Sequence, residues 1–205
     1  MRAFSFFVCY ILMMNHTPQI RRAIQFAARK HHGQMRVAHG GLPYIIHPFT
    51  VALLVAEDGA HDDVVAAALL HDTIEDTATT REEIASAFNE RVAELVVAVS
   101  EVREQDGREI GWRERKDSYL ALLARSADDA LLIAMADKVD NIESRLDEYE
   151  REGETFFTHF SQPNSEYVWF HGEVLKLAEA RLPEHPLTKR LAEVHARQVA
   201  AFAGK

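Results

Sequence analysis

No segment of this 205-residue chain shows the sustained alternation of apolar and polar residues that a half-buried β-strand requires. The chain contains only 9 Gly and 6 Pro, and residues that favour helices, such as Ala, Leu, Glu and Arg, are frequent. Helix-capping signals precede the apolar stretches: Thr17 is followed by Pro18, and Thr80 forms a capping box with Glu83. We therefore predict an all-α fold, a helical bundle without internal repeats.

The capping residues, glycines and prolines together place the expected helices. They cover residues 18–32, 48–57, 62–72, 82–102, 113–125, 127–149, 165–181 and 187–202. The helix over 82–102 is expected to bend near Asn89, and the segments 36–46, 103–111 and 153–164 are expected to be loops.

The length fits one domain with a full hydrophobic core, which we expect to cover residues 17–205. Residues 1–16 differ, because they carry the apolar run AFSFFVCYILMM, which is shorter than the roughly 20 residues of a membrane-spanning helix. We expect an apolar extension or a start codon assigned too early; a signal peptide is less favoured, because no small-residue cleavage pattern follows. The single cysteine, Cys9, fits a reducing compartment, so a cytoplasmic location without membrane attachment is expected.

The charge composition limits the partners of the chain. Its 23 Lys+Arg against 32 Asp+Glu give a net charge of −9, which argues against broad binding to nucleic acid, since such binding depends on neutralising phosphates. The 11 histidines are more than a hydrophobic core needs and point instead to metal or acid–base chemistry.

Polar residues interrupt three apolar helices. His71 and Asp72 end the run VVAAALL, Asp137 follows LLIAMA, and His47 stands directly before Pro48. Taken singly, a buried histidine is usually satisfied within a core and a helical aspartate usually forms a salt bridge, and spacing alone leaves that interpretation open. Together, two imidazoles and two carboxylates suit a divalent ion such as Mn²⁺, Fe²⁺ or Zn²⁺, with positions left for water.

Three ordered motifs carry a resemblance to a known family. They are GGLPYIIHP at 40–48, ALLHDTIED at 68–76 and ADKVDN at 136–141, preceded by AIQFAARKHHGQ at 23–34. In this order they resemble the HD-domain metal phosphohydrolases of the RelA/SpoT type, and above all the small stand-alone alarmone hydrolases related to metazoan SpoT homologues. The resemblance covers roughly residues 21–146, and it implies a helical hydrolase domain without the family's synthetase domain.

The resemblance implies a role for each matching position in the metal site. The implied metal ligands are His47, His71, Asp72 and Asp137. The ion usually bound in this family is Mn²⁺, which agrees with the mixture of nitrogen and oxygen ligands. Glu75 and Asp76 match an acidic pair that orients or deprotonates the attacking water.

The resemblance also implies contacts to a small nucleotide. Arg29 matches a residue that contacts the guanine base, and Asn141 matches one near the ribose. The full set of implied substrate-binding residues is Arg29, Lys30, Asn141, Ser144, Arg115 and Lys116. Tyr167 is a further candidate contact, whereas Trp112, within the charged region 101–115, stands where relatives can carry a lysine.

The implied reaction is hydrolysis of the 3′-pyrophosphate of guanosine tetra- or pentaphosphate, which releases pyrophosphate and GDP or GTP. One alternative is an HD phosphohydrolase that acts on a 5′-nucleotide, on a phosphorylated cofactor such as NADPH, or on an adenine alarmone. The alternative from another class is a catalytically idle module that binds metal or nucleotide as a sensor. Glu75 and Asp76 favour an enzyme over such a module.

Overall fold

The computed structural model describes residues 17–36, 41–57, 59–105 and 107–202, so the predicted apolar extension over 1–16 lies outside the described residues. The helices are α2 (Pro18–Lys30), α3 (Ile46–Glu57), α4 (Asp62–Leu70), α5 (Thr73–Asp76), α6 (Arg81–Ala87), α7 (Glu90–Ala98), α8 (Trp112–Arg125), α9 (Asp128–Glu152), the 3₁₀ helix η1 (Gly153–His159), α10 (Asn164–Arg181) and α11 (Pro186–Phe202). The all-α prediction is confirmed, since the described residues add only a two-residue strand pair, β1 (Glu104–Gln105) with β2 (Arg108–Glu109), and one isolated bridge.

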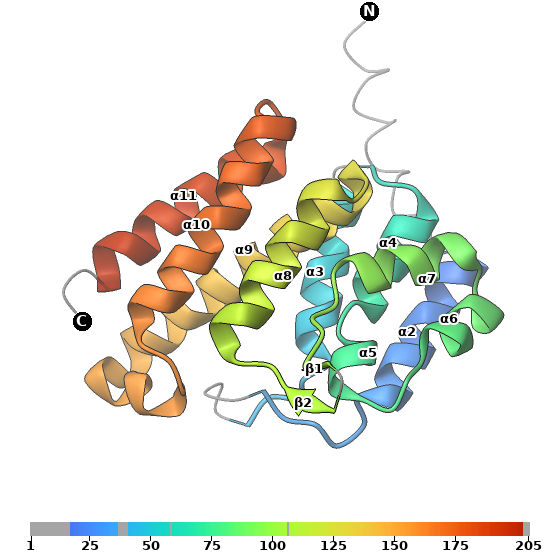
Figure 1. Cartoon of the computed structure of the whole chain (residues 1–205), viewed down its shortest axis with the longest axis horizontal. Helices are drawn as coiled ribbons and strands as arrows, with labels where there is room; N and C mark the ends of the chain where they lie inside the picture. The colour runs from blue at the N-terminus through green and yellow to red at the C-terminus, as the bar shows by residue number, and fades with distance from the viewer. Residues whose placement is uncertain (1–16, 37–40, 58, 106, 203–205) are drawn as a thin grey trace, which may run out of the picture.

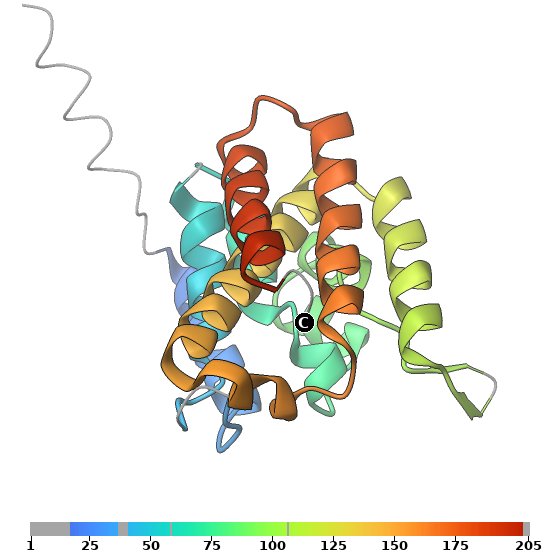
Figure 2. The same cartoon turned by 90° about the vertical axis from the view of Figure 1, so that its left-hand side faces the viewer.

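Helix α9 is the central element of the bundle. It packs against α3, α4 and α7 on one side and against α10 and α11 on the other (Figure 1). Figure 2 shows α10 and α11 running side by side, with the β1–β2 hairpin projecting away from the helices. Large side chains of α9, among them Leu131, Ile133 and Ile142, are fully buried. No helix in the described part of the chain is long and apolar enough to cross a membrane.

Helix α4 is buried at every position from Val64 to Leu70, because α2, α3 and α7 surround it. A helix that is apolar on all sides is stable only when its neighbours cover it completely. The helix ends at Leu70, two residues earlier than predicted, and the Thr73 hydroxyl donates to the Leu70 carbonyl at 2.7 Å. His71 and Asp72 therefore follow the helix directly where its hydrogen-bond ladder stops, and His71 stays buried.

The helix predicted over 82–102 is two helices, α6 and α7, rather than one bent helix. Asn89 separates them with an extended backbone, and its side-chain oxygen accepts from the Val92 N–H at 2.9 Å. Asparagine is a favoured N-cap because it satisfies a free amide of the first turn. The predicted cap of α6 is confirmed, since the Thr80 hydroxyl accepts from the Glu83 N–H.

Two segments expected to be loops contain regular structure. The segment 103–111 holds the β1–β2 hairpin, whose turn uses Gly107 at a φ of +73°. The segment 153–164 begins with η1, which buries Phe156 against Phe202 of α11 at a ring-centroid distance of 5.9 Å. Burial of Phe156 stabilises η1, and no helical pattern among the surrounding charged and polar residues predicts this helix.

Candidate metal centre and active site

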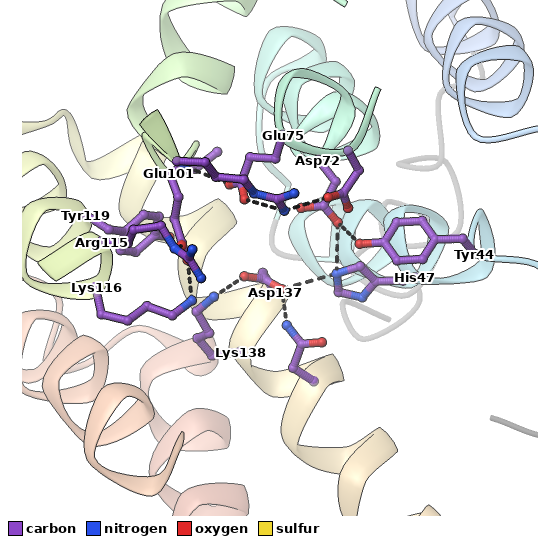
Figure 3. Close-up of a pocket in the computed structure, with 14 residues that line it drawn as sticks. Tyr44, His47, Asp72, Glu75, Glu101, Arg115, Lys116, Tyr119, Asp137 and Lys138 are labelled. Carbon is purple, nitrogen blue, oxygen red and sulfur yellow. Dashed lines mark hydrogen bonds and ion pairs between the residues drawn. The ribbon is translucent and has the colours of Figure 1, made fainter. Parts of the chain in front are cut away.

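Two histidines and two aspartates from three parts of the chain meet at one point, which we call the metal cluster: His47, His71, Asp72 and Asp137. His47 Nε2 lies 3.2 Å from Asp137 Oδ1 and 3.5 Å from Asp72 Oδ2. His71 Nε2 lies 3.1 Å from Asp72 Oδ2 and 3.9 Å from Asp137 Oδ1. Figure 3 shows His47, Asp72 and Asp137 pointing toward one another from α3, the end of α4 and α9.

The donor atoms of this cluster fit a divalent metal ion. Ligand atoms of His47, His71 and Asp137 lie within 4.8 Å of one another, and all three residues are buried. His71 Nε2 is buried and makes no well-directed hydrogen bond among the described residues, although Asp72 Oδ2 lies 3.1 Å away. A buried nitrogen without a well-directed hydrogen bond costs free energy that a metal bond would recover. The mixed imidazole and carboxylate set, without thiolate, suits a borderline divalent ion.

Outer contacts direct the two imidazoles toward the cluster. His47 Nδ1 donates to Asp140 Oδ2 at 2.6 Å, and Arg36 holds the same carboxylate at 2.7 Å. His71 Nδ1 donates to the Ala68 carbonyl at 2.9 Å. Because both Nδ1 atoms are hydrogen-bonded, each Nε2 faces the cluster. Metal-binding histidines are normally oriented by such a hydrogen bond from their other ring nitrogen.

The two aspartates of the cluster are also held from outside. The Tyr44 hydroxyl donates to Asp72 Oδ2 at 2.6 Å, and burial together with the Asp72 charge raises the pKa of Tyr44, which keeps the donor protonated. Asp137 pairs with the Lys138 ammonium and accepts from the Asn141 amide. Burial would raise the pKa of Asp137, but the Lys138 charge holds it well below its usual range.

The protein groups alone favour protonated imidazoles. Burial by itself would lower the pKa of His71, but the Asp72 charge outweighs burial and raises it to about 9. Burial also opposes the charge on His47, and hydrogen bonds to Asp137 and Asp140 raise its pKa in the same way. An incoming cation therefore competes with protons for both Nε2 atoms.

The predicted acidic pair lies on α5, beside the metal cluster. Glu75 Oε1 accepts from the Glu101 backbone N–H at 2.8 Å, and Arg103 lies 2.7 Å from Asp76 Oδ1. Burial raises the pKa of Glu75 to about 8, and the nearby charges of Asp72 and Glu101 add to this effect. A carboxyl group with such a pKa exchanges its proton near neutral pH.

Opposite the metal cluster lies a set of charged residues that we call the cation wall: Glu101, Arg115 and Lys116. Lys116 pairs with Glu101 Oε1, and Arg115 Nε lies 3.4 Å from Glu101 Oε2. The Lys116 ammonium also sits 4.3 Å from the centre of the Phe170 ring, and burial lowers the pKa of this lysine. Figure 3 shows Glu101, Arg115 and Lys116 together on this side.

A cavity of about 240 Å³ separates the metal cluster from the cation wall. It brings together most of the residues predicted from sequence. Those that line it are His47, Asp72, Glu75, Asp76, Arg115, Lys116, Asp137 and Asn141 (Figure 3).

Comparison with known proteins gives this architecture its family. A model of the family described as "HD domain" matches residues 23–162. The chain belongs to the HD domain family. The predicted resemblance to the RelA/SpoT-type hydrolases is confirmed by two curated relatives and a solved structure.

The first relative of this HD domain is from Aquifex aeolicus and is named guanosine-3′,5′-bis(diphosphate) 3′-pyrophosphohydrolase. It is 43% identical over 131 residues, 63% of this chain but only 18% of that protein. The human relative of the same name, MESH1, is 38% identical over 132 residues, which cover 63% of this chain and 71% of that protein. The solved structure, titled "A metazoan ortholog of SpoT hydrolyzes ppGpp and plays a role in starvation responses", has a TM-score of 0.74 and 25% identity, and the match covers 89% of this chain and 96% of that one.

Three predicted substrate contacts of the HD domain lie away from the residues that line the cavity. Lys30 pairs with Glu83 of α6 at 2.8 Å, and Arg29 is exposed on α2. Ser144 is half-buried on α9, beyond Asn141. Their roles stay predictions. The further candidate Tyr167 packs edge-on against Trp112, with ring centroids 5.6 Å apart.

Sequence reasoning missed several residues around the HD-domain cavity. Tyr44 lies inside the motif GGLPYIIHP, and Lys138 and Asp140 lie inside ADKVDN, so the motifs themselves carry a signal for these three residues. Glu101 and Arg103 lie in the charged region after α7, where no periodicity or capping pattern distinguishes one charged side chain from another.

Proposed function

We propose that this protein hydrolyses the 3′-pyrophosphate of guanosine tetra- or pentaphosphate, releasing pyrophosphate and GDP or GTP. The observation that carries this proposal is the convergence of a metal cluster, an acidic pair and a cation wall on one HD-domain cavity. The printed names of the Aquifex and human relatives support the same substrate. The single Cys9 favours a cytoplasmic site of action.

We propose Mn²⁺ as the bound ion, with Fe²⁺ and Zn²⁺ as the other candidates, and Asp72 as a ligand beside His47, His71 and Asp137. A bound ion of this kind supplies Lewis acidity and lowers the pKa of a coordinated water. The contacts of Tyr44 with Asp72 and of Lys138 with Asp137 support the assignment, because fixed outer partners orient ligating carboxylates.

The acidic pair supplies the acid–base chemistry. Water adds to the phosphorus attached to the 3′-oxygen, and the bond between this phosphorus and the 3′-oxygen breaks. Pyrophosphate leaves, and the 3′-oxygen takes up a proton. Glu75, with a pKa of about 8 and a place on the cavity surface, is suited to accept the proton that the water loses. Arg103 holds Asp76 in place beside it.

The cation wall balances the negative charge of the substrate. A guanosine polyphosphate is strongly anionic and the chain carries a net charge of −9, so cations must be concentrated locally. Arg115 and Lys116 line the cavity, and they are the proposed contacts to phosphate oxygens. Asn141 is proposed to lie near the ribose, Arg29 to contact the base, and Lys30 and Ser144 to add outer contacts.

The deciding experiment is incubation of Mn²⁺-loaded protein with guanosine tetraphosphate, with products resolved by anion exchange. GDP and pyrophosphate are expected from the wild type and not from Asp72→Ala. Metal binding without turnover would contradict the proposal. A panel of other nucleotides, NADPH included, then tests for a different HD phosphohydrolase, and binding without hydrolysis of any of them identifies a sensor module.

A further inference from the structure

Glu101 is the one carboxylate among the described cavity-lining residues to which the proposed mechanism gives no task. The other four belong to the metal cluster or the acidic pair. The Glu101 side chain is only 11% exposed, and its negative charge opposes the entry of an anionic ligand. A charge in this position is costly, so its contacts indicate what it does.

Each oxygen of the Glu101 carboxylate faces a different cation. Oε1 pairs with Lys116, and Oε2 lies 3.4 Å from Arg115 Nε. Lys116 is itself 15% exposed, so its ammonium needs an anionic partner to remain at the cavity. A phosphate group bridges a lysine and an arginine through two oxygens in the same manner. The carboxylate therefore takes the place on these cations that phosphate oxygens take.

The backbone of Glu101 is held by a hydrogen bond, although the residue lies outside the helices and strands, and its side chain can rotate. The residue lies between α7 and β1, and its N–H donates to Glu75 Oε1 at 2.8 Å. The side chain has rotatable bonds between that anchor and its carboxylate, so the carboxylate can leave the two cations without disturbing the hydrogen bond to Glu75.

We propose that Glu101 is a displaceable carboxylate: it holds Arg115 and Lys116 at the cavity wall and is exchanged for a phosphate group of the ligand. This inference rests on the proposed function for the identity of that ligand, a pyrophosphate-bearing nucleotide. The exchange makes binding of the anion weaker than the cations alone would give. It thereby favours release of the pyrophosphate product.

The test measures binding of inorganic pyrophosphate by isothermal titration calorimetry at one fixed Mn²⁺ concentration. Glu101→Gln removes the competing charge, and we expect it to bind pyrophosphate about tenfold more tightly, as expected for the loss of one partly screened like charge. The matched control is Glu114→Gln, on α8 next to Arg115. The Glu114 carboxylate pairs with Arg108 and does not line the cavity. The control should bind as the wild type does.

Unchanged, weaker or undetectable binding of pyrophosphate by Glu101→Gln overturns the proposal. If that variant does not fold, Glu101→Asp withdraws the carboxylate by one methylene, and it should bind about threefold more tightly. Where guanosine tetraphosphate is turned over, Glu101→Gln should lower KM and strengthen inhibition by pyrophosphate. Because binding is measured without turnover, failure of the proposed reaction leaves the calorimetric result interpretable, and the reverse holds too.

Discussion

The two sides of the cavity differ in how their side chains are held. The metal cluster is carried by α3, α9 and the end of α4, and its histidines are 3% exposed. The cation wall comes from the first turn of α8 and from an irregular segment after α7, and ion pairs between its own side chains hold it together. The buried core thus fixes the metal side, whereas charge pairing fixes the side expected to meet phosphate. Changes on the metal side should alter metal affinity, and changes on the cation wall should alter ligand affinity alone.

The largest effect is expected from His71→Ala. It removes a buried nitrogen of the metal cluster, so metal binding and turnover should both be lost, with activity falling by roughly three orders of magnitude or more. Metal content by mass spectrometry and hydrolysis of guanosine tetraphosphate measure the two losses. The matched control is His32→Ala, an exposed histidine just after α2, which should retain both. Full metal occupancy in His71→Ala would remove this residue from the ligand set.

The next effect separates the acidic pair from the metal cluster. Glu75→Gln keeps the shape of the side chain but cannot accept a proton, so kcat should fall by about 10²–10⁴-fold with metal content unchanged. Steady-state kinetics and metal analysis on the same sample check this. Glu82→Gln, at an exposed position of α6, is the control. An equal loss of metal and rate would make Glu75 part of the metal side.

The pH dependence of metal binding tests the charge state of that side. The pKa of His71 is raised to about 9, so its imidazole carries a proton at pH 7 in the absence of metal, and the pKa of His47 is raised in the same direction. Metal binding should therefore release the His71 proton, and affinity should rise with pH until about pH 9. Below that pKa, displacing this proton costs about tenfold in affinity per pH unit, and protonation of His47 adds to the same dependence. Calorimetry in buffers of different ionisation enthalpy counts the protons, and no release would contradict the assignment.

A smaller effect is expected from a residue that touches the metal cluster without binding metal. Tyr44→Phe removes the hydroxyl that donates to Asp72 Oδ2 and leaves the ring in place. Loss of an outer partner should weaken metal binding by about 10–100-fold. Competition with a metal-sensitive dye measures the affinity, and Tyr167→Phe, against Trp112, is a control of the same chemistry. Unchanged affinity would mean that the core alone orients Asp72.

The sequence predicts the metal cluster better than it predicts the cation wall. His71 and Asp72 were predicted because they interrupt an apolar run within an ordered motif. That run forms the buried helix α4, so the local sequence pattern matches the structure there. Glu101 was not predicted, because its role depends on the approach of α5 and α8 to one loop, and a charged segment without periodicity does not encode that approach. Asn89 was expected to bend a helix and instead begins one, since the capping hydrogen bond outweighs continuation of the helical pattern.

The smallest effect belongs to the cation wall and completes the comparison. Lys116→Met keeps a long apolar stem against Phe170 but removes the charge, so KM for guanosine tetraphosphate should rise about tenfold. Metal affinity should not change, because Lys116 pairs with Glu101 and, among the described residues, forms no hydrogen bond or ion pair with the metal cluster. Lys176→Met, an exposed change on α10, should leave both quantities as in the wild type. A fall in metal affinity of Lys116→Met would show that the two sides of the cavity are coupled. In that case, the ion pairs between side chains would also support the metal cluster.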